Sequence, residues 1–240
     1  MASTNHKRVI LKLSGEAFSL PDGKGVNVDK LTEITTEIAA AHSTGARIGI
    51  VNGAGNFVRG KDFAGSDVVE PITADYMGMM ATIINSLALR DSLKSRGIPA
   101  TVFSAMPAPT ICDHYYRPEV IEQMDGGTVA IFAGGTGHPG VTTDMCAAIR
   151  ANETGAEIIL KATKVDGVYD KDPESNSDAV RYDKLTLGQA VAEKLGVMDL
   201  ASLAFCMDKG IPVRVFNMSV PGNLLAAVNG EDCGTLVTAC

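Results

Sequence analysis

Four short apolar runs, each ending in glycines or in a lysine-rich segment, constrain the fold of this chain most strongly. They lie at Val9–Leu11, Arg47–Val51, Thr128–Ala133 and Glu157–Leu160. Each run is too short for a buried helix and is bounded by turn residues, so each is predicted to be a buried strand. A helical pattern separates the first two runs, and right-handed crossovers make such strands parallel. The pattern predicts an α/β protein built on a mostly parallel central sheet.

The composition fits this interpretation and argues against some classes of protein. The 240 residues are 45% apolar and include 25 glycines, which suits one large domain, or two intimately joined lobes, with a substantial core. With 28 acidic and 21 basic residues, the net charge of −7 argues against a general nucleic-acid binder, which needs a basic face. Any phosphate ligand must therefore be met by local groups.

Neither a targeting segment nor a membrane helix is predicted. The start, MASTNHKR, is polar, and no apolar run approaches the roughly 20 residues that a membrane helix needs. The 5 cysteines are odd in number, scattered and without CxxC spacing, which fits reduced thiols and argues against a zinc site. We expect a soluble, cytoplasmic protein without a membrane partner.

The turn after the first run carries groups that suit a phosphate. Lys12, Ser14 and Gly15 follow the strand directly. In an open parallel sheet the carboxyl ends of the strands face the ligand crevice, so these residues are predicted at its mouth. The alternative is a solvated lysine beside an ordinary turn glycine.

A second loop, Asn52–Asn56, follows the second run and precedes Arg59. Closely spaced glycines let consecutive backbone N–H groups converge on an anion. Arg59 would add a forked donor for a phosphate. The alternative is a flexible loop with an exposed arginine.

A third loop follows the strand at Thr128–Ala133 and matches GxGxxG at Gly135, Gly137 and Gly140. This context is typical of dinucleotide binding, but the acid expected about 20 residues on is missing, since the next strand ends in Lys161. The loop still suits a phosphate at a helix N-terminus.

Two acids stand near helix starts. Asp75 is predicted in the first turn of a long helix over Thr73–Arg96, and Asp144 opens the helix after the third loop. Each could complement the helix dipole, and Asp144 could instead hold Mg²⁺ or orient a cation. His138 is interpreted as a solvated loop histidine rather than a base.

The long helix has an apolar surface wider than one stripe, which indicates either a central core helix or one covered by another subunit.

The other predicted elements are a helix capped by Asp29 and running to His42, helices at 118–124, 185–195, 199–209 and 223–229, and strands at 100–103, 213–216 and 235–237. Lys161 and Lys164 flank Thr163, and a turn separates them from Tyr169 and Asp172.

Together these segments resemble the amino acid kinase superfamily, and within it the bacterial uridylate (UMP) kinases. The resemblance covers nearly the whole chain, and an ordered series of motifs is far more specific than one glycine loop. The motifs are VILKLSGEAF, NGAGNFVRG, ADYMGMMAT, GGTGHPGVTTD, LKATKVDGVYDKDP, VMDL and PVRVFN. The resemblance implies a three-layer αβα sandwich, a homohexamer built as a trimer of dimers, and phosphoryl transfer from ATP·Mg²⁺ to UMP in pyrimidine nucleotide biosynthesis.

The resemblance also implies roles for individual positions. The ATP-binding residues would be Lys12, Leu13, Ser14, Gly15, Gly55, Arg59, Thr163, Tyr169 and Asp172. The UMP-binding residues would be Ala54, Asp75, Thr136, Gly137, His138, Pro139, Gly140, Val141, Thr142 and Thr143. The catalytic candidates would be Lys12, Arg59, Asp144, Lys161 and Asp199. Which acid contacts Mg²⁺, and whether Lys161 or Lys164 contacts the transferred phosphate, stay open.

Two departures from the family pattern matter. Ala54 replaces a common glycine, which requires a negative φ there. Thr101 and Thr128 stand where related sequences carry arginines of a GTP site, although the chain offers Arg90. These substitutions argue against activation by GTP, whereas feedback inhibition by UTP at the UMP site fits the resemblance. The resemblance implies allosteric regulation, and whether GTP activates or UTP inhibits stays open.

We expect a single domain over residues 1–240, with 1–155 as the UMP-binding and oligomerisation lobe and 156–240 as mainly the ATP-binding lobe.

The expected mechanism is direct in-line transfer without a catalytic base, since a phosphate monoester has a second pKa of about 6 and is already mostly ionised. The alternatives are a carbamate or acyl-phosphate-forming kinase on the same scaffold, an NAD(P)-dependent oxidoreductase, and a non-catalytic nucleotide sensor.

Overall fold

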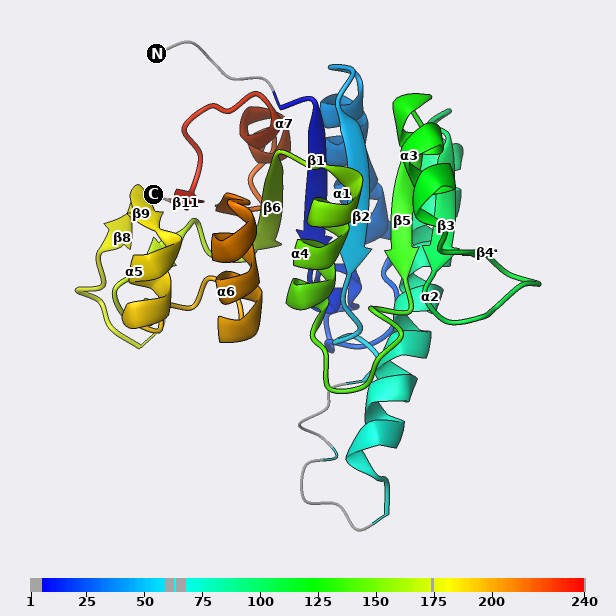
Figure 1. The fold of residues 1–240 in the computed structure, drawn as a ribbon, viewed down its shortest axis with the longest axis horizontal. Coiled ribbons are helices and arrows are strands. Elements are labelled where there is room, and N and C mark those ends of the chain that lie inside the picture. Colours follow the sequence, from blue (N-terminus) through cyan, green and yellow to red (C-terminus); the bar gives the residue numbers. More distant parts are fainter. Residues whose placement is uncertain (1–5, 59–62, 64–67, 174, 240) are drawn as a thin grey trace.

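A central sheet with helices on both faces forms the protein in this computed structural model, which describes residues 6–58, 63, 68–173 and 175–239 (Figure 1). Within these residues, nine strands lie in the order β4-β3-β5-β2-β1-β6-β10-β11-β9. All neighbours are parallel except β10 and β11. The strands are β1 (Arg8–Leu13), β2 (Arg47–Asn52), β3 (Ala100–Ser104), β4 (Asp113–His114), β5 (Val129–Ala133), β6 (Ile158–Thr163), β9 (Lys184–Thr186), β10 (Val213–Asn217) and β11 (Thr235–Thr238). A separate antiparallel pair joins β7 (Val168–Tyr169) to β8 (Arg181–Tyr182).

The helices form a layer on each side of the sheet. One face is covered by α1 (Val28–His42), α2 (Pro71–Lys94) and α7 (Asn223–Val228), with the short 3-10 helix η1 (Gly15–Phe18) beside them. The other face is covered by α3 (Arg117–Asp125), α4 (Thr143–Thr154), α5 (Leu187–Ala192) and α6 (Leu200–Lys209). The predicted three-layer αβα sandwich around a mostly parallel sheet is confirmed.

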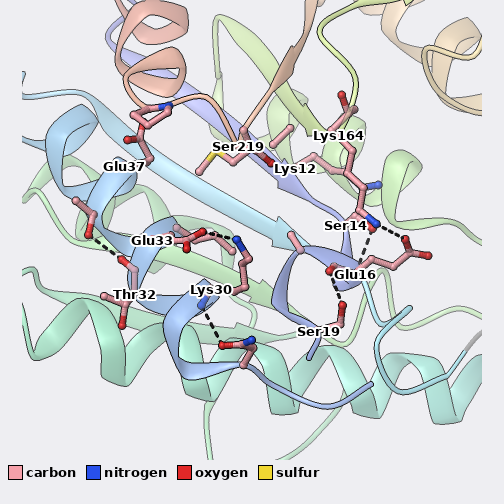
Figure 2. A pocket seen from close by; sticks show the side chains of 18 of the residues that line it. Lys12, Ser14, Glu16, Ser19, Lys30, Thr32, Glu33, Glu37, Lys164 and Ser219 are labelled. Carbon is pink, nitrogen blue, oxygen red and sulfur yellow. Dashed lines mark hydrogen bonds and ion pairs between the residues drawn. The ribbon is translucent and has the colours of Figure 1, made fainter. Parts of the chain in front are cut away.

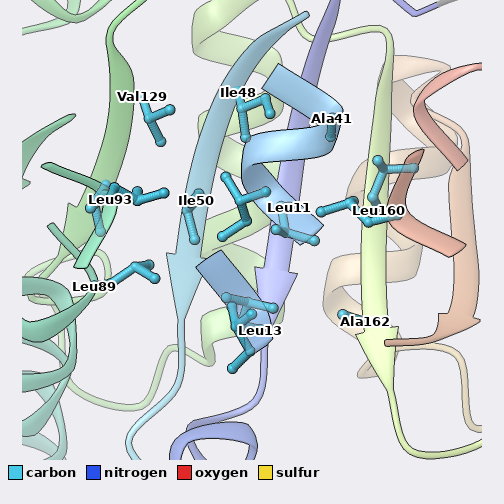
Figure 3. Packing of buried hydrophobic residues seen from close by; sticks show 14 of the residues in the cluster. Leu11, Leu13, Ala41, Ile48, Ile50, Leu89, Leu93, Val129, Leu160 and Ala162 are labelled. Carbon is cyan, nitrogen blue, oxygen red and sulfur yellow. The ribbon is translucent and has the colours of Figure 1, made fainter. Parts of the chain in front are cut away.

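Strand β1 shows how the sequence builds these layers. Val9 and Leu11 belong to the apolar cluster beneath α1 and α2, and Ile10 belongs to the cluster beneath α4. Figure 3 shows Leu11 among Ile50, Leu160 and other members of the first cluster. Since successive side chains of a strand alternate between faces, Lys12 shares the α4 side with Ile10. The alternation therefore delivers one cation to the carboxyl end of an otherwise apolar strand.

Two predicted helix starts are wrong. The N-cap of α1 is Asn27 rather than Asp29, because the Asn27 side chain accepts from the backbone N–H groups of Asp29 and Lys30 at 2.8 and 3.2 Å. Helix α2 begins at Pro71. Proline lacks a backbone N–H, and the first turn of a helix has no partner for one, so proline fits at this position. Asp75 therefore lies in the second turn of α2, not the first.

Two further boundaries differ from prediction. Strand β6 runs to Thr163, two residues beyond Lys161, where the strand was predicted to end. Leu185 does not begin a helix but pairs with Val237 in β9, and α5 follows it from Leu187.

Helix α2 extends beyond the carboxyl ends of the strands, and the chain between β5 and α4 lies at that same end of the molecule (Figure 1). Among the helices of the described residues, none combines the length and apolar character needed to cross a membrane.

Candidate active site

The centre of the candidate site is an aspartate held between two lysines. Lys12 of β1 and Lys161 of β6 are directly paired in the parallel register, and Asp144 lies in the first turn of α4. Lys12 Nζ lies 2.7 Å from Asp144 Oδ1, and Lys161 Nζ donates to Asp144 Oδ2 at 2.8 Å. The three side chains are 12, 15 and 13% exposed, respectively, for Lys12, Lys161 and Asp144. Two cations and one anion therefore share a largely desolvated place.

The charges of this cluster depend on one another. Burial alone would raise the pKa of Asp144, but the two lysines outweigh it and hold that pKa below its usual range. The pKa of Lys161 lies below its usual range, because burial and the charge of Lys12 outweigh the attraction of Asp144. Removing one partner of such a buried pair typically costs about 3–5 kcal/mol. The cluster carries excess positive charge, which suits a polyanionic ligand.

The loops after β1 and β2 touch through bare backbone. A Cβ added at Gly15 would lie 2.4 Å from the Gly55 nitrogen, and one added at Gly53 would lie 2.9 Å from the Gly15 nitrogen. Gly53 N donates to the Leu13 carbonyl at 2.9 Å. Ala54 is not among the described residues with positive φ, as its replacement of glycine requires. Glycine is therefore needed at both positions, because the two loop backbones approach too closely for a side chain.

The loop between β5 and α4 is attached at both ends to other elements. Asp75 of α2 accepts from the Gly140 N–H at 2.7 Å. Thr142 is the N-cap of α4, where its Oγ1 accepts from Met145 N at 3.1 Å and donates to Asp199. Gly135, Gly137 and Gly140 have φ of 57°, 80° and 75°, values that glycine adopts readily. The loop is therefore fixed by α2 and by α6 next to Asp144.

Asp199 has a structural role as well as a place in the site. It is the N-cap of α6, where it accepts from Ser202 N at 3.0 Å and from the hydroxyls of Ser202 and Thr142. Burial would raise its pKa, but these hydrogen bonds lower it overall. Asp199 therefore stays ionised and ties α6 to the start of α4.

A cavity of about 1370 Å³ opens at the same ends of the strands. Lys12 and Ser14, from β1 and its turn, and Lys161 and Thr163, from β6, line one part of it, and α1 lines another. Figure 2 shows Lys30, Glu33 and Glu37 of α1 directed toward this cavity, with Lys12 and Ser14 at its far side. The cavity is large enough for a nucleotide-sized ligand.

Two predicted ATP-binding residues, Tyr169 and Asp172, lie on or just after the β7 and β8 pair. Tyr169 belongs to the β7 and β8 pair and donates to Asp166 Oδ1 at 2.6 Å. Asp172 follows it and accepts from Ser175 Oγ at 2.8 Å. Neither is among the described residues that line the cavity of Lys12. Arg59 lies outside the described residues.

The remaining predicted positions fall on the loop after β5 and on the β1 end. His138 Nδ1 lies 3.1 Å from the carbonyl oxygen of Thr136, and no carboxylate in the described part of the chain hydrogen-bonds to the ring. Leu13 has its side chain in the core and offers only its carbonyl. The loop is completed by Gly137, Pro139, Val141 and Thr143. In residues 6–58, 63, 68–173 and 175–239, no cluster of three or more His, Cys, Asp or Glu could hold a metal ion.

Sequence analysis missed a group of buried polar residues beneath the loops. These residues are 2% exposed or less: Asn52, Asn56, Thr82, Asn85 and Ser86. Polar residues on the inner face of an otherwise apolar helix were the available signal for the three from α2.

Comparison with known proteins shows which family this sequence and fold resemble. Residues 7–217 match the amino acid kinase family. A uridylate kinase from Xanthomonas oryzae pv. oryzae is 45% identical over 237 residues, which cover 99% of this chain and 98% of that protein. The crystal structure of UMP kinase from Bacillus anthracis has a TM-score of 0.94 at 36% identity, covering 98% of this chain and 97% of that one. The UMP kinase structure from Ureaplasma parvum has a TM-score of 0.91 at 34% identity, covering 98% and 100%.

A family match over most of the chain, an identity of 45% with near-complete coverage, and the shared fold agree with one another. The chain belongs to the amino acid kinase family.

Proposed function

We propose that the protein is a UMP kinase, which transfers the γ-phosphoryl group of ATP to UMP to give ADP and UDP. The observation that carries the proposal is the buried cluster of Lys12, Asp144 and Lys161 beside two touching glycine loops. The relatives named uridylate kinase or UMP kinase support the choice of acceptor.

The donor ATP would bind from the β1 and β6 side. Lys12 and Lys161 would neutralise the transferred phosphoryl, and the backbone of Ser14, Gly15 and Gly55 would bind phosphate oxygens. Thr163, Tyr169 and Asp172 are proposed to line the nucleoside pocket, and Arg59 to bind phosphate. Leu13 would contribute backbone only. Magnesium would enter with ATP as part of the substrate, since both Asp144 oxygens are already close to lysines.

The acceptor UMP would bind from the α2 and α4 side. Asp75 and Ala54 are proposed to contact it, and the loop of Thr136, Gly137, His138, Pro139, Gly140, Val141, Thr142 and Thr143 to surround its phosphate and base. The N-terminus of α4 favours an anion there.

Catalysis would consist of alignment and charge neutralisation. The acceptor phosphate has a second pKa of about 6 and needs no base to attack. Both reactants are anions, so fixed cations and backbone amides must offset their repulsion. Asp144 would keep Lys12 and Lys161 in place between turnovers, and Asp199 would hold Thr142 at the start of α4.

An acceptor screen tests the proposal. ADP release from ATP is measured with UMP, CMP, aspartate, acetylglutamate and carbamate as acceptors. Fast release with UMP is expected. Preference for carbamate or a carboxylate would replace the proposed acceptor with another used by a kinase of this fold, and nucleotide binding without transfer would indicate a sensor.

The assembly is proposed to be a homohexamer in the cytoplasm. Helix α2 exposes Ile72, Tyr76, Met80 and Ile84, and an exposed apolar stripe of this kind fits a subunit interface. The four cysteines in the described residues are free thiols, which fits a reducing compartment. Residues 1–155 would bind UMP and oligomerise, and residues 156–240 would mainly bind ATP.

UTP is proposed to inhibit by competing with UMP at the UMP site, and allosteric regulation through a second site is a separate proposal. UTP should then raise the KM for UMP without changing kcat. The effect of GTP is measured in the same assay.

A further inference from the structure

Three polar side chains on the buried face of α2 reach the two loops that flank the candidate phosphoryl-transfer centre. Thr82, Asn85 and Ser86 are 2%, 0% and 0% exposed. Buried polar groups cost free energy unless they are hydrogen-bonded, so their partners show what they are for.

Asn85 forms a two-way bridge with Asn56, which lies in the loop after β2. Asn56 Nδ2 donates to Asn85 Oδ1 at 2.9 Å, and Asn85 Nδ2 donates to Asn56 Oδ1 at 2.8 Å. The same nitrogens also donate to backbone carbonyls: that of Asn85 to Gly53 at 2.9 Å and that of Asn56 to Gly25 at 2.7 Å. Each amide nitrogen has two N–H groups, so both donors of each side chain are used.

The Gly53 carbonyl lies at a critical point of the site. Gly53 N donates to the Leu13 carbonyl, and the loop it begins touches Gly15 so closely that no side chain fits between them. Asn85 therefore holds this loop from the α2 side while β1 holds it from the other. A shift of the Gly53 peptide would move Gly55 against Gly15.

Thr82 and Ser86 attach neighbouring strand ends to the same helix. Thr82 Oγ1 accepts from the Gly134 N–H at 2.8 Å, where the loop after β5 begins. Ser86 Oγ accepts from Asn52 Nδ2 at 2.7 Å, at the end of β2, and donates to the Thr82 carbonyl at 2.8 Å. One helix thus sets the separation of the two loops.

We infer that Asn85, through its bridge with Asn56, is a positioning residue for phosphoryl transfer. It fixes the glycine loop at Gly53–Gly55 in the alignment that donor and acceptor phosphates require. The inference rests on the proposed kinase function and adds a residue that touches neither substrate in the proposed arrangement. Misplacement of reacting groups by about 1 Å can cost on the order of 100-fold in rate, so loss of the bridge should appear in kcat.

The test compares Asn85→Asp with Leu89→Ala in the full-length protein. Asn85→Asp keeps the side-chain shape and the acceptor for Asn56, but an oxygen replaces the nitrogen that donates both to the Gly53 carbonyl and to Asn56 Oδ1. Leu89 lies one turn further along α2, is fully buried and belongs to the apolar core, so its truncation destabilises the helix without touching either loop. Steady-state kcat and KM for ATP and UMP are measured with thermal unfolding of each variant.

Asn85→Asp should lower kcat by about tenfold or more with both KM values changed by less than about threefold. Leu89→Ala should lose thermal stability and keep kcat within about twofold of wild type. If the aspartate variant does not fold, Asn85→Ser, which also removes the donor to Gly53 at this distance, is expected to show the same loss of kcat.

Unchanged kcat in a folded Asn85 variant, or an equal loss of kcat in Leu89→Ala, would overturn the positioning role. A wild-type protein that does not phosphorylate UMP would overturn the proposed function itself, and this inference with it. The two failures are therefore distinguished by the wild-type measurement.

Discussion

Lys12 interrupts an apolar strand, and its neighbours explain why a cation is tolerated there. It is largely buried against Asp144 and faces Lys161 across the β1 and β6 register. Lys12→Ala should lower kcat by about 100-fold or more while the protein stays folded, because it removes a fixed cation from the transferred phosphoryl. Steady-state kinetics and circular dichroism check this, with Lys209→Ala, an exposed lysine of α6, as the control that keeps its rate. Equal kcat in the two variants would remove Lys12 from the mechanism.

The carboxylate of Asp144 should make stability depend on acid. Its folded pKa is lowered, so its contribution to the free energy of unfolding is full above the ordinary value near 3.9 and is lost as pH falls through the folded pKa. Asp144→Asn leaves two buried cations without their anion and should cost about 3–5 kcal/mol at pH 7. Urea unfolding of the wild type and of Asp144→Asn is measured between pH 7 and about pH 3. The difference between their free energies of unfolding should narrow below about pH 4. If this difference in unfolding free energy does not change with pH, the Asp144 carboxylate is not the stabilising partner.

At the scale of elements, the contact between the β1 and β2 loops is the feature most sensitive to substitution. A Cβ at Gly15 would overlap the backbone of Ala54 and Gly55, so Gly15→Ala should separate the loops. We expect a loss of about 1–3 kcal/mol in stability and of at least about tenfold in kcat. Gly188→Ala, in α5, meets its nearest neighbour at 3.8 Å and should leave kcat unchanged. Thermal unfolding and turnover of both variants decide the matter, and full activity of Gly15→Ala would contradict it.

Most strands and helices could be predicted from the sequence, and the errors in their predicted boundaries have local causes. Alternation and short apolar runs located the parallel strands, because burial on both faces leaves an apolar run in the sequence. The start of α1 was misplaced because Asp29 is a good N-cap type, yet Asn27 comes first and makes the cap bonds. Leu185 was placed in a helix because an isolated edge strand of three residues, β9, has almost no pattern of its own.

At the scale of the whole molecule, the sequence could predict which end of the sheet carries the site but not how its residues pair. Lys12 and Lys161 were predictable as strand-end cations, since parallel strands end at one edge. That Asp144 lies between them, and that Thr142 donates to Asp199, depends on how α4 and α6 pack on the sheet. The bridge between Asn56 and Asn85 was missed for the same reason, because neither residue has a local partner that a spacing rule could detect.

The proposed hexamer depends on an apolar stripe on the surface of α2. Ile72, Tyr76, Met80 and Ile84 recur every four residues and are 57, 42, 59 and 49% exposed, so they form one apolar stripe on the helix that extends beyond the sheet (Figure 1). Met80→Asp would place a charge in the proposed interface, where desolvation disfavours it. Light scattering should show a mass of about three subunits or fewer instead of six, since a trimer of dimers needs both of its interfaces to reach six subunits. Val180→Asp alters an exposed valine outside α2 and should keep the assembly of the wild type. If Met80→Asp keeps the full mass, the stripe is not the interface, and the exposed apolar face of α2 needs another explanation.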